Sequence, residues 1–406
     1  MRIDDYEPII GKSSIEELRL LADKLSGKVI RNINSTYAGG GVAEILSRML
    51  PLFNQLGVDA RWSVIKGNDE FFQVTKKIHN ALHGRGGPLS PQDISLFKET
   101  SQKNIEEINL SGDILFIHDP QPIALVEKKK EIGKRWIWRC HVDVSQPIES
   151  VWGFLEPWVT QYDAAVFSAP AFSRPLPMRQ FLISPSIDPL SDKNKGLPRD
   201  TIDAVLSKYG VPNDKPMIVQ ISRFDYLKDP VGVIKAFKLV KRSIDCSLVL
   251  AGGTATDDPE SSTVLAEVKE KAGNDPDIHI LLIPPDSNVE INALQRAATV
   301  ILQKSLKEGF GLTVSEALWK AKPVVASAVG GIPLQVKNKF TGLLSHGIEG
   351  TAFAIRQILT NPEYAKWLGE NGKEHVRHNF LITRHLKEYL LLFISLDHSE
   401  DVIYLS

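Results

Sequence analysis

The sequence predicts an α/β protein built from two doubly wound domains, and three observations support this prediction. Short apolar runs typical of buried parallel strands alternate with helical stretches along most of the chain. Glycine-rich turns follow several of these runs, as they do where a strand leads into a nucleotide-binding helix. A chain of 406 residues is also long for a single core and fits two domains of ordinary size.

The composition narrows the class of protein. Hydrophobic content of 43% and charged content of 24% are typical of a soluble globular enzyme, and a net charge of −1 argues against a nucleic-acid or membrane-surface binder. The segment from Met1 to Glu7 is acidic and no apolar run is long enough to cross a bilayer, so we expect neither a secretory signal nor a membrane span. Cys140 and Cys246 lie in apolar strand-like runs, which predicts buried thiols in a reducing compartment, the cytoplasm.

The first half opens with a strand, a glycine loop and a helix. A helix from Ser13 to Leu25 precedes the strand Val29 to Ile33, and three glycines that include Gly40 and Gly41 lead into a helix from Val42 to Leu56. Three consecutive glycines do not match the dinucleotide fingerprint G-x-G-x-x-G. The loop is therefore either a flexible turn or a loop whose N–H groups reach a donor phosphate or an acceptor.

Polar side chains follow two buried strands of the first half. The strands are Ile114 to Ile117 and Trp136 to Cys140, and the side chains are His118, Asp119, Gln121, His141 and Asp143. In parallel sheets ligands bind at the carboxyl ends of strands, which favours a functional site here. A metal site is less favoured, because the two histidines follow separate strands and no further ligand shares their spacing.

The second half repeats the pattern after a linker. We expect the strand Ala164 to Ser168 to close the first sheet and the proline-rich segment Ile183 to Pro189 to be the linker. The strand Met217 to Ile221 is followed by Arg223 and Lys228, two cations that can converge on one diphosphate. A later strand ends in Gly252 and Gly253, which would allow the backbone close to a ligand.

The most informative stretch is an apolar run, a Gly-Phe-Gly turn and a helix. The run spans Ala297 to Leu302, the turn is Gly309 to Gly311, and the helix is expected over Thr313 to Ala321. Free N–H groups and the helix dipole make such a helix start an anion site. Glu308 and Glu316 flank the turn and would repel a diphosphate, so the N–H groups are assigned to phosphates and the glutamates to sugar hydroxyls. Two glutamates eight residues apart also occur by chance on solvated surfaces.

These motifs carry a family resemblance over nearly the full chain. Glu308-x7-Glu316 around Gly-Phe-Gly resembles the E-x7-E signature of retaining glycosyltransferases of family 4, which have the GT-B architecture. The strings His118-Asp-Pro-Gln-Pro and Trp138-Arg-Cys-His141-Val-Asp143 resemble the branch that includes trehalose-forming synthases and trehalose phosphorylases. The resemblance implies two Rossmann-like domains that face each other across a cleft. The variable region Phe72–Thr100 and the C-terminal tail depart from it.

The resemblance also implies a division of labour between domains. Residues 1–187 would form the acceptor-binding domain and residues 188–380 the nucleotide-sugar-binding domain, with the helix in 381–406 packing back on the first domain. The implied catalytic residues are His141, Arg223, Lys228 and Glu308, and the implied acceptor-binding residues are His118, Asp119, Gln121 and Asp143. The implied donor-binding residues are Gly40, Gly41, Gly252, Gly253, Ile283, Gly309, Phe310, Gly311, Leu312, Thr313 and Glu316.

The activity implied is retaining glucosyl transfer from a nucleoside diphosphate glucose to glucose, which yields trehalose. No side chain is an obvious covalent nucleophile, so departure and attack on the same face are expected, with a diphosphate oxygen taking the acceptor proton. No cofactor is required, no metal site is assigned, and Mg²⁺ can accompany the diphosphate. Neither nucleic acid nor membrane is an expected partner, and the oligomeric state stays open, a homodimer included.

Four alternatives stay open at this point. A trehalose phosphorylase, or a related retaining glucosyltransferase with another acceptor, would use the same pocket. A nicotinamide-dependent oxidoreductase would share Rossmann-like halves, but the fingerprint is absent. A silent nucleotide-sugar sensor would not need the set of Glu308, Arg223 and His141 that the sequence retains.

Overall fold

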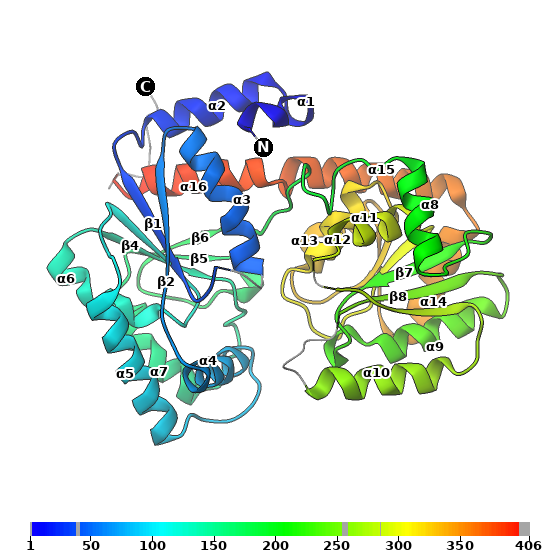
Figure 1. Ribbon diagram of the computed structural model, residues 1–406, viewed down its shortest axis with the longest axis horizontal. Coiled ribbons are helices and arrows are strands. Elements are labelled where there is room, and N and C mark those ends of the chain that lie inside the picture. The colour runs from blue at the N-terminus through cyan, green and yellow to red at the C-terminus, as the bar shows by residue number, and fades with distance from the viewer. Residues whose placement is uncertain (1, 38–40, 254–258, 285, 398–406) are drawn as a thin grey trace. The chain divides into compact units, whose positions relative to one another are not determined.

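Two compact units make up the chain. The computed structural model describes residues 2–37, 41–253, 259–284 and 286–397, so the predicted donor residue Gly40 lies outside the described residues. Unit 1 consists of Met1–Pro185 and Ile382–Ser406, and unit 2 of Ser186–Leu381. Each unit holds one six-stranded parallel sheet with helices on both faces (Figure 1). The predicted α/β class with two doubly wound halves is confirmed.

The sheet of unit 1 has the order β2-β1-β3-β4-β5-β6. Its strands are β1 (Val29–Asn34), β2 (Asp59–Val64), β3 (Ile114–His118), β4 (Arg135–Cys140), β5 (Ala164–Phe167) and β6 (Arg179–Leu182). The chain leaves β1 in one direction and returns on its other side at β3, so the strand order reverses between β1 and β3. Ligands of doubly wound sheets bind at such a reversal, at the carboxyl ends of the strands.

One expectation about this sheet is wrong. The strand at Ala164 does not close it, because β6 pairs in parallel with β5 beyond it. The β6 sequence, Arg-Gln-Phe-Leu, is mostly exposed at the sheet edge and so lacks the apolar run that reveals a buried strand.

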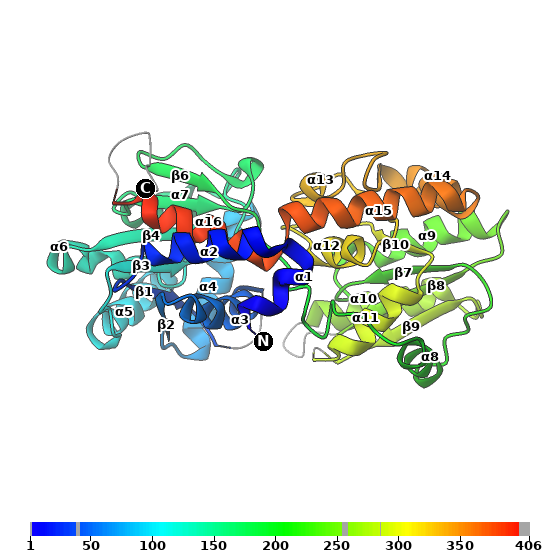
Figure 2. The ribbon, with the colours of Figure 1, turned by 90° about the horizontal axis from the view of Figure 1, so that it is seen from above.

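Helices cover both faces of the unit 1 sheet (Figures 1 and 2). One face carries α2 (Lys12–Asp23), α3 (Gly41–Gln55) and α16 (Ile382–Ser395), and the other carries α4 (Asp69–Leu82), α5 (Pro91–Glu107) and α7 (Glu149–Val159). Shorter elements are η1 (Ile3–Tyr6), α1 (Glu7–Ile10), η2 (Ile123–Lys128), α6 (Lys129–Ile132) and η3 (Pro170–Phe172). The return of the last helix to the first half is confirmed: Phe393 of α16 packs its ring 5.5 Å from that of Phe116 in β3 and 6.1 Å from that of Phe53 in α3.

The sheet of unit 2 has the order β12-β11-β10-β7-β8-β9. Its strands are β7 (Met217–Ile221), β8 (Ser247–Gly252), β9 (Ile278–Leu282), β10 (Val300–Gln303), β11 (Val324–Ser327) and β12 (Leu343–Ser345). The helical elements are α8 (Arg199–Lys208), η4 (Tyr226–Lys228), α9 (Pro230–Lys241), α10 (Pro259–Ala272), α11 (Asn288–Ala297), α12 (Leu312–Trp319), α13 (Ile332–Gln335), α14 (Gly347–Leu359) and α15 (Pro362–Asn379). The strand order here reverses between β7 and β10, which defines the second expected ligand edge.

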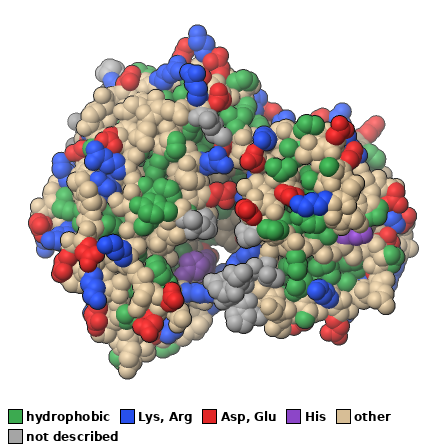
Figure 3. Space-filling view, viewed as in Figure 1, with side chains coloured by type: hydrophobic (Ala, Val, Ile, Leu, Met, Phe, Trp, Pro, Cys, Tyr) green, Lys and Arg blue, Asp and Glu red, His purple; other side chains and the backbone are tan. Residues whose placement is uncertain are grey.

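The surface carries mixed charge. On the face shown in Figure 3, Lys and Arg side chains are interspersed with Asp and Glu over each unit, without a large patch of one sign. This pattern agrees with the net charge of −1. Within the described residues, no helix has the length and apolar character needed to cross a membrane.

Candidate functional site

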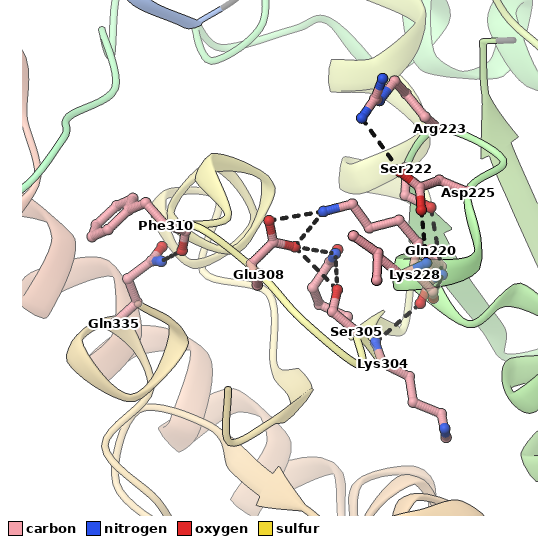
Figure 4. Close-up of polar contacts among 12 residues, drawn as sticks. Gln220, Ser222, Arg223, Asp225, Lys228, Lys304, Ser305, Glu308, Phe310 and Gln335 are labelled. Carbon is pink, nitrogen blue, oxygen red and sulfur yellow. Dashed lines mark hydrogen bonds and ion pairs between the residues drawn. The ribbon is translucent and has the colours of Figure 1, made fainter. Parts of the chain in front are cut away.

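Four side chains meet at the carboxyl ends of β7 and β10, where the order of the unit 2 sheet reverses. Glu308 accepts hydrogen bonds from Lys228 Nζ at 2.8 and 2.6 Å, from Gln303 Nε2 at 3.2 Å and from Ser305 Oγ at 3.0 Å (Figure 4). The side chains of Lys228 and Glu308 are 18% and 9% exposed. A carboxylate with this many donors is held in one orientation.

Two buried glutamines support this cluster from the sheet. Gln220 of β7 donates from Nε2 to Lys228 O at 2.9 Å, and its Oε1 accepts from Lys304 N at 3.1 Å. Gln303 ends β10 and contacts Glu308 directly. Gln303, Ser305 and Gln220 are site residues that the motifs of the sequence do not include. The available signal was an amide within each of two otherwise apolar strands, since a buried amide needs polar partners.

The Gly-Phe-Gly turn leads into α12, which begins at Leu312, one residue before the predicted start. Gly311 adopts a left-handed conformation with φ of 78°, and no described side chain caps the helix. The first N–H groups of an uncapped helix lack intrahelical partners and favour an anion. The carbonyl of Phe310 accepts from Gln335, and Gly309 O accepts from Gly331 N at 2.7 Å, so the second glycine turn fixes the first.

Gly330 is expected to tolerate no side chain. Its φ is +57°, and an added Cβ would lie 1.9 Å from the carbonyl oxygen of Glu308. Gly330→Ala should therefore displace the turn. Its free energy of unfolding should fall by more than the roughly 1–2 kcal/mol that a left-handed non-glycine residue costs, which would appear as a lower melting temperature. Gly210→Ala is the matched control, because Gly210 has φ of +62° but open space around its Cβ position. Equal losses in thermal unfolding of the two variants would contradict this prediction.

Glu316 lies in α12, and its partners differ from those of Glu308. The residue is 6% exposed, and its carboxylate lies 3.9 Å from Lys193 Nζ. Lys320, also buried, donates to Glu316 O at 3.1 Å and to Asn194 Oδ1 at 3.0 Å. Burial lowers the pKa of Lys320 to about 7, although the nearby Glu316 opposes that shift. The two glutamates of the motif are thus both fixed, but by different neighbours.

The remaining predicted residues of unit 2 lie along the neighbouring strand ends. Arg223 follows β7, is 61% exposed and pairs with Asp225 Oδ2 at 3.4 Å (Figure 4). Among the described residues, Arg223 and Lys228 therefore have different partners, Asp225 and Glu308. Gly252 ends β8 close to the backbone of Ser222, since an added Cβ would lie 1.9 Å from Ser222 O. Ile283 donates its N–H to Gly252 O at 3.0 Å and lies beside Gly253.

In unit 1, two histidines meet at the carboxyl ends of β3 and β4. His118 Nδ1 lies 3.3 Å from His141 Nε2, and the rings stack with centroids 5.6 Å apart. His118 Nε2 lies 3.1 Å from Asn32 Oδ1, so both ring nitrogens of His118 already have partners. Burial, followed by the charge of Arg139, lowers the pKa of His118 to about 3 and also lowers that of His141. Both rings are therefore neutral at pH 7.

Asp119 fixes the backbone next to these rings. Its Oδ1 accepts from His141 N at 2.8 Å, its carbonyl accepts from Trp138 Nε1 at 3.1 Å, and its φ is +65°. Burial raises the pKa of Asp119 to about 6, while the hydrogen bond from His141 N opposes the shift. A left-handed non-glycine residue is costly and is often retained at functional sites. The Asp119 side chain is thus committed to positioning His141.

The other predicted residues of unit 1 differ in whether their polar atoms have hydrogen-bond partners. Gln121 Oε1 is enclosed and has no hydrogen-bond partner among the described residues. Asp143 Oδ1 accepts from Ser145 N at 2.9 Å and from Ser145 Oγ at 2.6 Å. Gly41 is the first residue of α3. An enclosed acceptor without a donor is costly, so Gln121 is a strong candidate to receive a ligand hydroxyl.

A cavity of about 960 Å³ lies elsewhere in unit 1. It is lined by α5, η2 and α7, including Lys98, Phe154 and Trp158, and by none of the predicted site residues. Among the described residues, no group of three or more His, Cys, Asp or Glu side chains could hold a metal ion.

Comparison with known proteins matches both units to described families. Residues 32–174 match the N-terminal domain of trehalose synthase, and residues 202–375 match glycosyl transferases group 1. The chain is 43% identical to the trehalose synthase of Rubrobacter xylanophilus, over 97% of this chain and 96% of that protein. It is 30% identical to the trehalose phosphorylase of Grifola frondosa, over 92% of this chain and 58% of that protein.

A solved structure shows the same architecture. The α,α-trehalose-phosphate synthase (UDP-forming) from Burkholderia xenovorans, in complex with glucose-6-phosphate, aligns with a TM-score of 0.71 at 14% identity, over 91% of this chain and 100% of that chain. At this identity the likeness supports the GT-B fold alone. The full-length relationship at 43% identity, together with both matched domains, shows that the chain belongs to the trehalose synthase family of glycosyltransferases.

Proposed function

We propose that the protein transfers glucose from a nucleoside diphosphate glucose to the anomeric hydroxyl of glucose with retention, producing trehalose and a nucleoside diphosphate. The observation that carries the proposal is the Lys228–Glu308 pair next to the uncapped start of α12. A cation and free N–H groups at one strand edge suit a diphosphate leaving group, and a fixed carboxylate suits a sugar hydroxyl.

The donor would bind to unit 2. The N–H groups at Gly309–Thr313 and the ammonium of Lys228 would face the diphosphate, and Arg223 would turn from its exposed position to the same charge. Glu308 would bind hydroxyls of the transferred glucose and Glu316 the ribose, while backbone near Ile283 would contact the base. As the glycosidic bond breaks, charge grows on the diphosphate, so fixed positive potential there lowers the barrier. The diphosphate oxygen would then take the acceptor proton.

The acceptor would bind to unit 1, at the carboxyl ends of β3 and β4. Gln121 and Asp143 have polar atoms available for glucose hydroxyls. His118 and Asp119 are also implied at the acceptor, but both ring nitrogens of His118 contact Asn32 or His141, and Asp119 Oδ1 accepts from His141 N. We therefore propose that these two residues position His141. A location in the cytoplasm, a homodimer and a Mg²⁺ ion beside the diphosphate stay predictions.

The direct test is a panel of UDP-, ADP- and GDP-glucose incubated with glucose, with products identified by their anomeric linkage. Formation of α,α-trehalose and a nucleoside diphosphate would support the proposal. The alternative, trehalose phosphorylase, has a specific observation in its favour, the 30% identity to the Grifola frondosa protein. Release of glucose 1-phosphate from trehalose and inorganic phosphate, without use of any nucleotide sugar, would favour that alternative.

Loss of Asp143 is expected to weaken glucose binding and spare donor binding. A buried hydrogen bond contributes roughly 0.5–1.5 kcal/mol, and more when one partner is charged. Asp143→Ala should therefore raise KM for glucose by about one to two powers of ten. Donor affinity measured by calorimetry should not change, because the nucleotide is assigned to unit 2. Ser145→Ala is the control, since it removes the serine hydroxyl from Asp143 while keeping the carboxylate. Lost nucleotide binding in folded Asp143→Ala would contradict the assignment.

A further inference from the structure

A chain of three side chains connects the first strand of unit 1 to His141. Asn32 of β1 is 3% exposed, and its Oδ1 lies 3.1 Å from His118 Nε2. His118 Nδ1 lies in turn 3.3 Å from His141 Nε2. The strands β1 and β3 flank the reversal point of the sheet, so these three side chains lie at the expected ligand edge. No motif of the sequence includes Asn32.

The orientation of Asn32 determines the direction of both hydrogen bonds among Asn32, His118 and His141. Asn32 Nδ2 donates to the carbonyl of Arg61 at 3.5 Å, which orients the amide so that Oδ1 faces His118. An amide oxygen can only accept, so His118 Nε2 must carry a proton. A neutral imidazole has one N–H, which leaves His118 Nδ1 as an acceptor. His141 Nε2 must then be the donor, and His141 Nδ1 keeps its lone pair.

We infer that Asn32 and His118 are positioning residues that hold His141 in the Nε2–H tautomer, so that His141 offers Nδ1 to a sugar hydroxyl as an acceptor. Within the described residues, His141 Nδ1 has no hydrogen-bond partner. Asp119 holds the main chain of His141 at 2.8 Å, so ring and backbone are both fixed. The sugar as ligand rests on the proposed function; the tautomer does not.

The tautomer can be measured without any substrate. We propose two-bond ¹H–¹⁵N correlation spectra of the full chain labelled with ¹⁵N-histidine at pH 7.5, with His141 assigned by the signals that disappear in His141→Gln. The expected spectrum shows His118 and His141 both as neutral Nε2–H forms. A protonated Nδ1 on His141, or a mixture of tautomers in the wild-type protein, would overturn the inference.

Substitution of Asn32 should change the tautomer of His141. In Asn32→Asp the carboxylate favours a doubly protonated His118, which donates from both nitrogens and turns His141 into the Nδ1–H form. Asn32→Leu removes the acceptor and should give mixed tautomers, which provides a second test if the aspartate variant does not fold. Both variants should lower kcat/KM about tenfold, the loss expected for one oriented hydrogen bond.

A matched control lies two residues along the same strand. Asn34 is also 3% exposed, and its Oδ1 accepts from Trp62 Nε1 at 2.8 Å; among the described residues it has no hydrogen bond to either histidine. Asn34→Asp places the same charge in β1 and should leave the tautomer of His141 unchanged. An unchanged His141 in both Asn32 variants would overturn the inference. If His141 has the expected tautomer but the protein transfers no glucose, only the proposed function is rejected. If the protein transfers glucose while His141 is in the Nδ1–H form, only the inference about Asn32, His118 and His141 is rejected.

Discussion

Lys228→Met should lower kcat by about 10²–10³ while changing donor affinity far less. Lys228 is the described cation bound directly to Glu308, and it lies at the strand edge assigned to the diphosphate. Charge on the leaving group increases only as the glycosidic bond breaks, so a fixed cation stabilises the transition state more than the bound donor. Steady-state kinetics with saturating glucose, combined with calorimetric titration of the donor, would measure the two effects separately.

The control for this variant is the same substitution at a lysine near the amino-terminal end of β7, the end opposite to Lys228. Lys215 precedes β7 and pairs with Asp277 at 2.7 Å and with Asp245 at 3.1 Å, so Lys215→Met also removes an ion-paired lysine of unit 2. We expect Lys215→Met to keep wild-type kcat. A Lys228→Met enzyme with unchanged kcat and only a raised KM would mean that Lys228 binds the donor without contributing to catalysis.

Glu308→Gln and Glu316→Gln should affect different kinetic constants. Glu308 is assigned to the transferred glucose and its carboxylate receives Lys228, Gln303 and Ser305, so the neutral amide should lower kcat by about 10², in the range known for loss of one preorganised group. Glu316 is assigned to the ribose, remote from the breaking bond, so its amide should raise the donor KM about tenfold with little loss of kcat.

The two glutamate variants serve as controls for each other. They carry the same isosteric change on residues of the same turn and helix. The opposite pattern, with a kcat loss for Glu316→Gln and a KM increase for Glu308→Gln, would mean that the two carboxylates have exchanged ligands. Circular dichroism of both variants would establish that neither result comes from unfolding.

The sequence predicts the fold and the strand ends well because both depend on local signals. Apolar runs and glycine turns predicted β7 and β10, the strands that precede Lys228 and Glu308. The histidines were expected at strand ends, where β3 ends at His118 and His141 directly follows β4. Strand β6 was missed because an exposed edge strand has no apolar run to detect.

The partners inside the sites were not predictable, since they depend on which strands become neighbours. Asn32 and His118 are 86 residues apart, and Lys228 and Glu308 are 80 apart, yet each pair is within hydrogen-bond distance. A buried amide such as Gln303 in an apolar run shows that a polar partner exists without showing which one. Spacing along a loop does not determine the partner of a cation either: Arg223 pairs with Asp225 and Lys228 with Glu308, and their convergence on one diphosphate stays a prediction.

The discontinuity of unit 1 determines the order in which the chain can fold during synthesis. Unit 2 is a continuous segment ending at Leu381, so all its strands have left the ribosome while α16 is still being made. Unit 1 must wait for α16, whose Tyr389 and Phe393 rings pack against Phe116 at 5.0 and 5.5 Å. Until then this apolar face of the nascent sheet has α2 and α3 but lacks α16, which covers Phe116. The N-terminal half, although translated first, is therefore the last to become complete, and the interval before α16 emerges is when chaperones have most to protect.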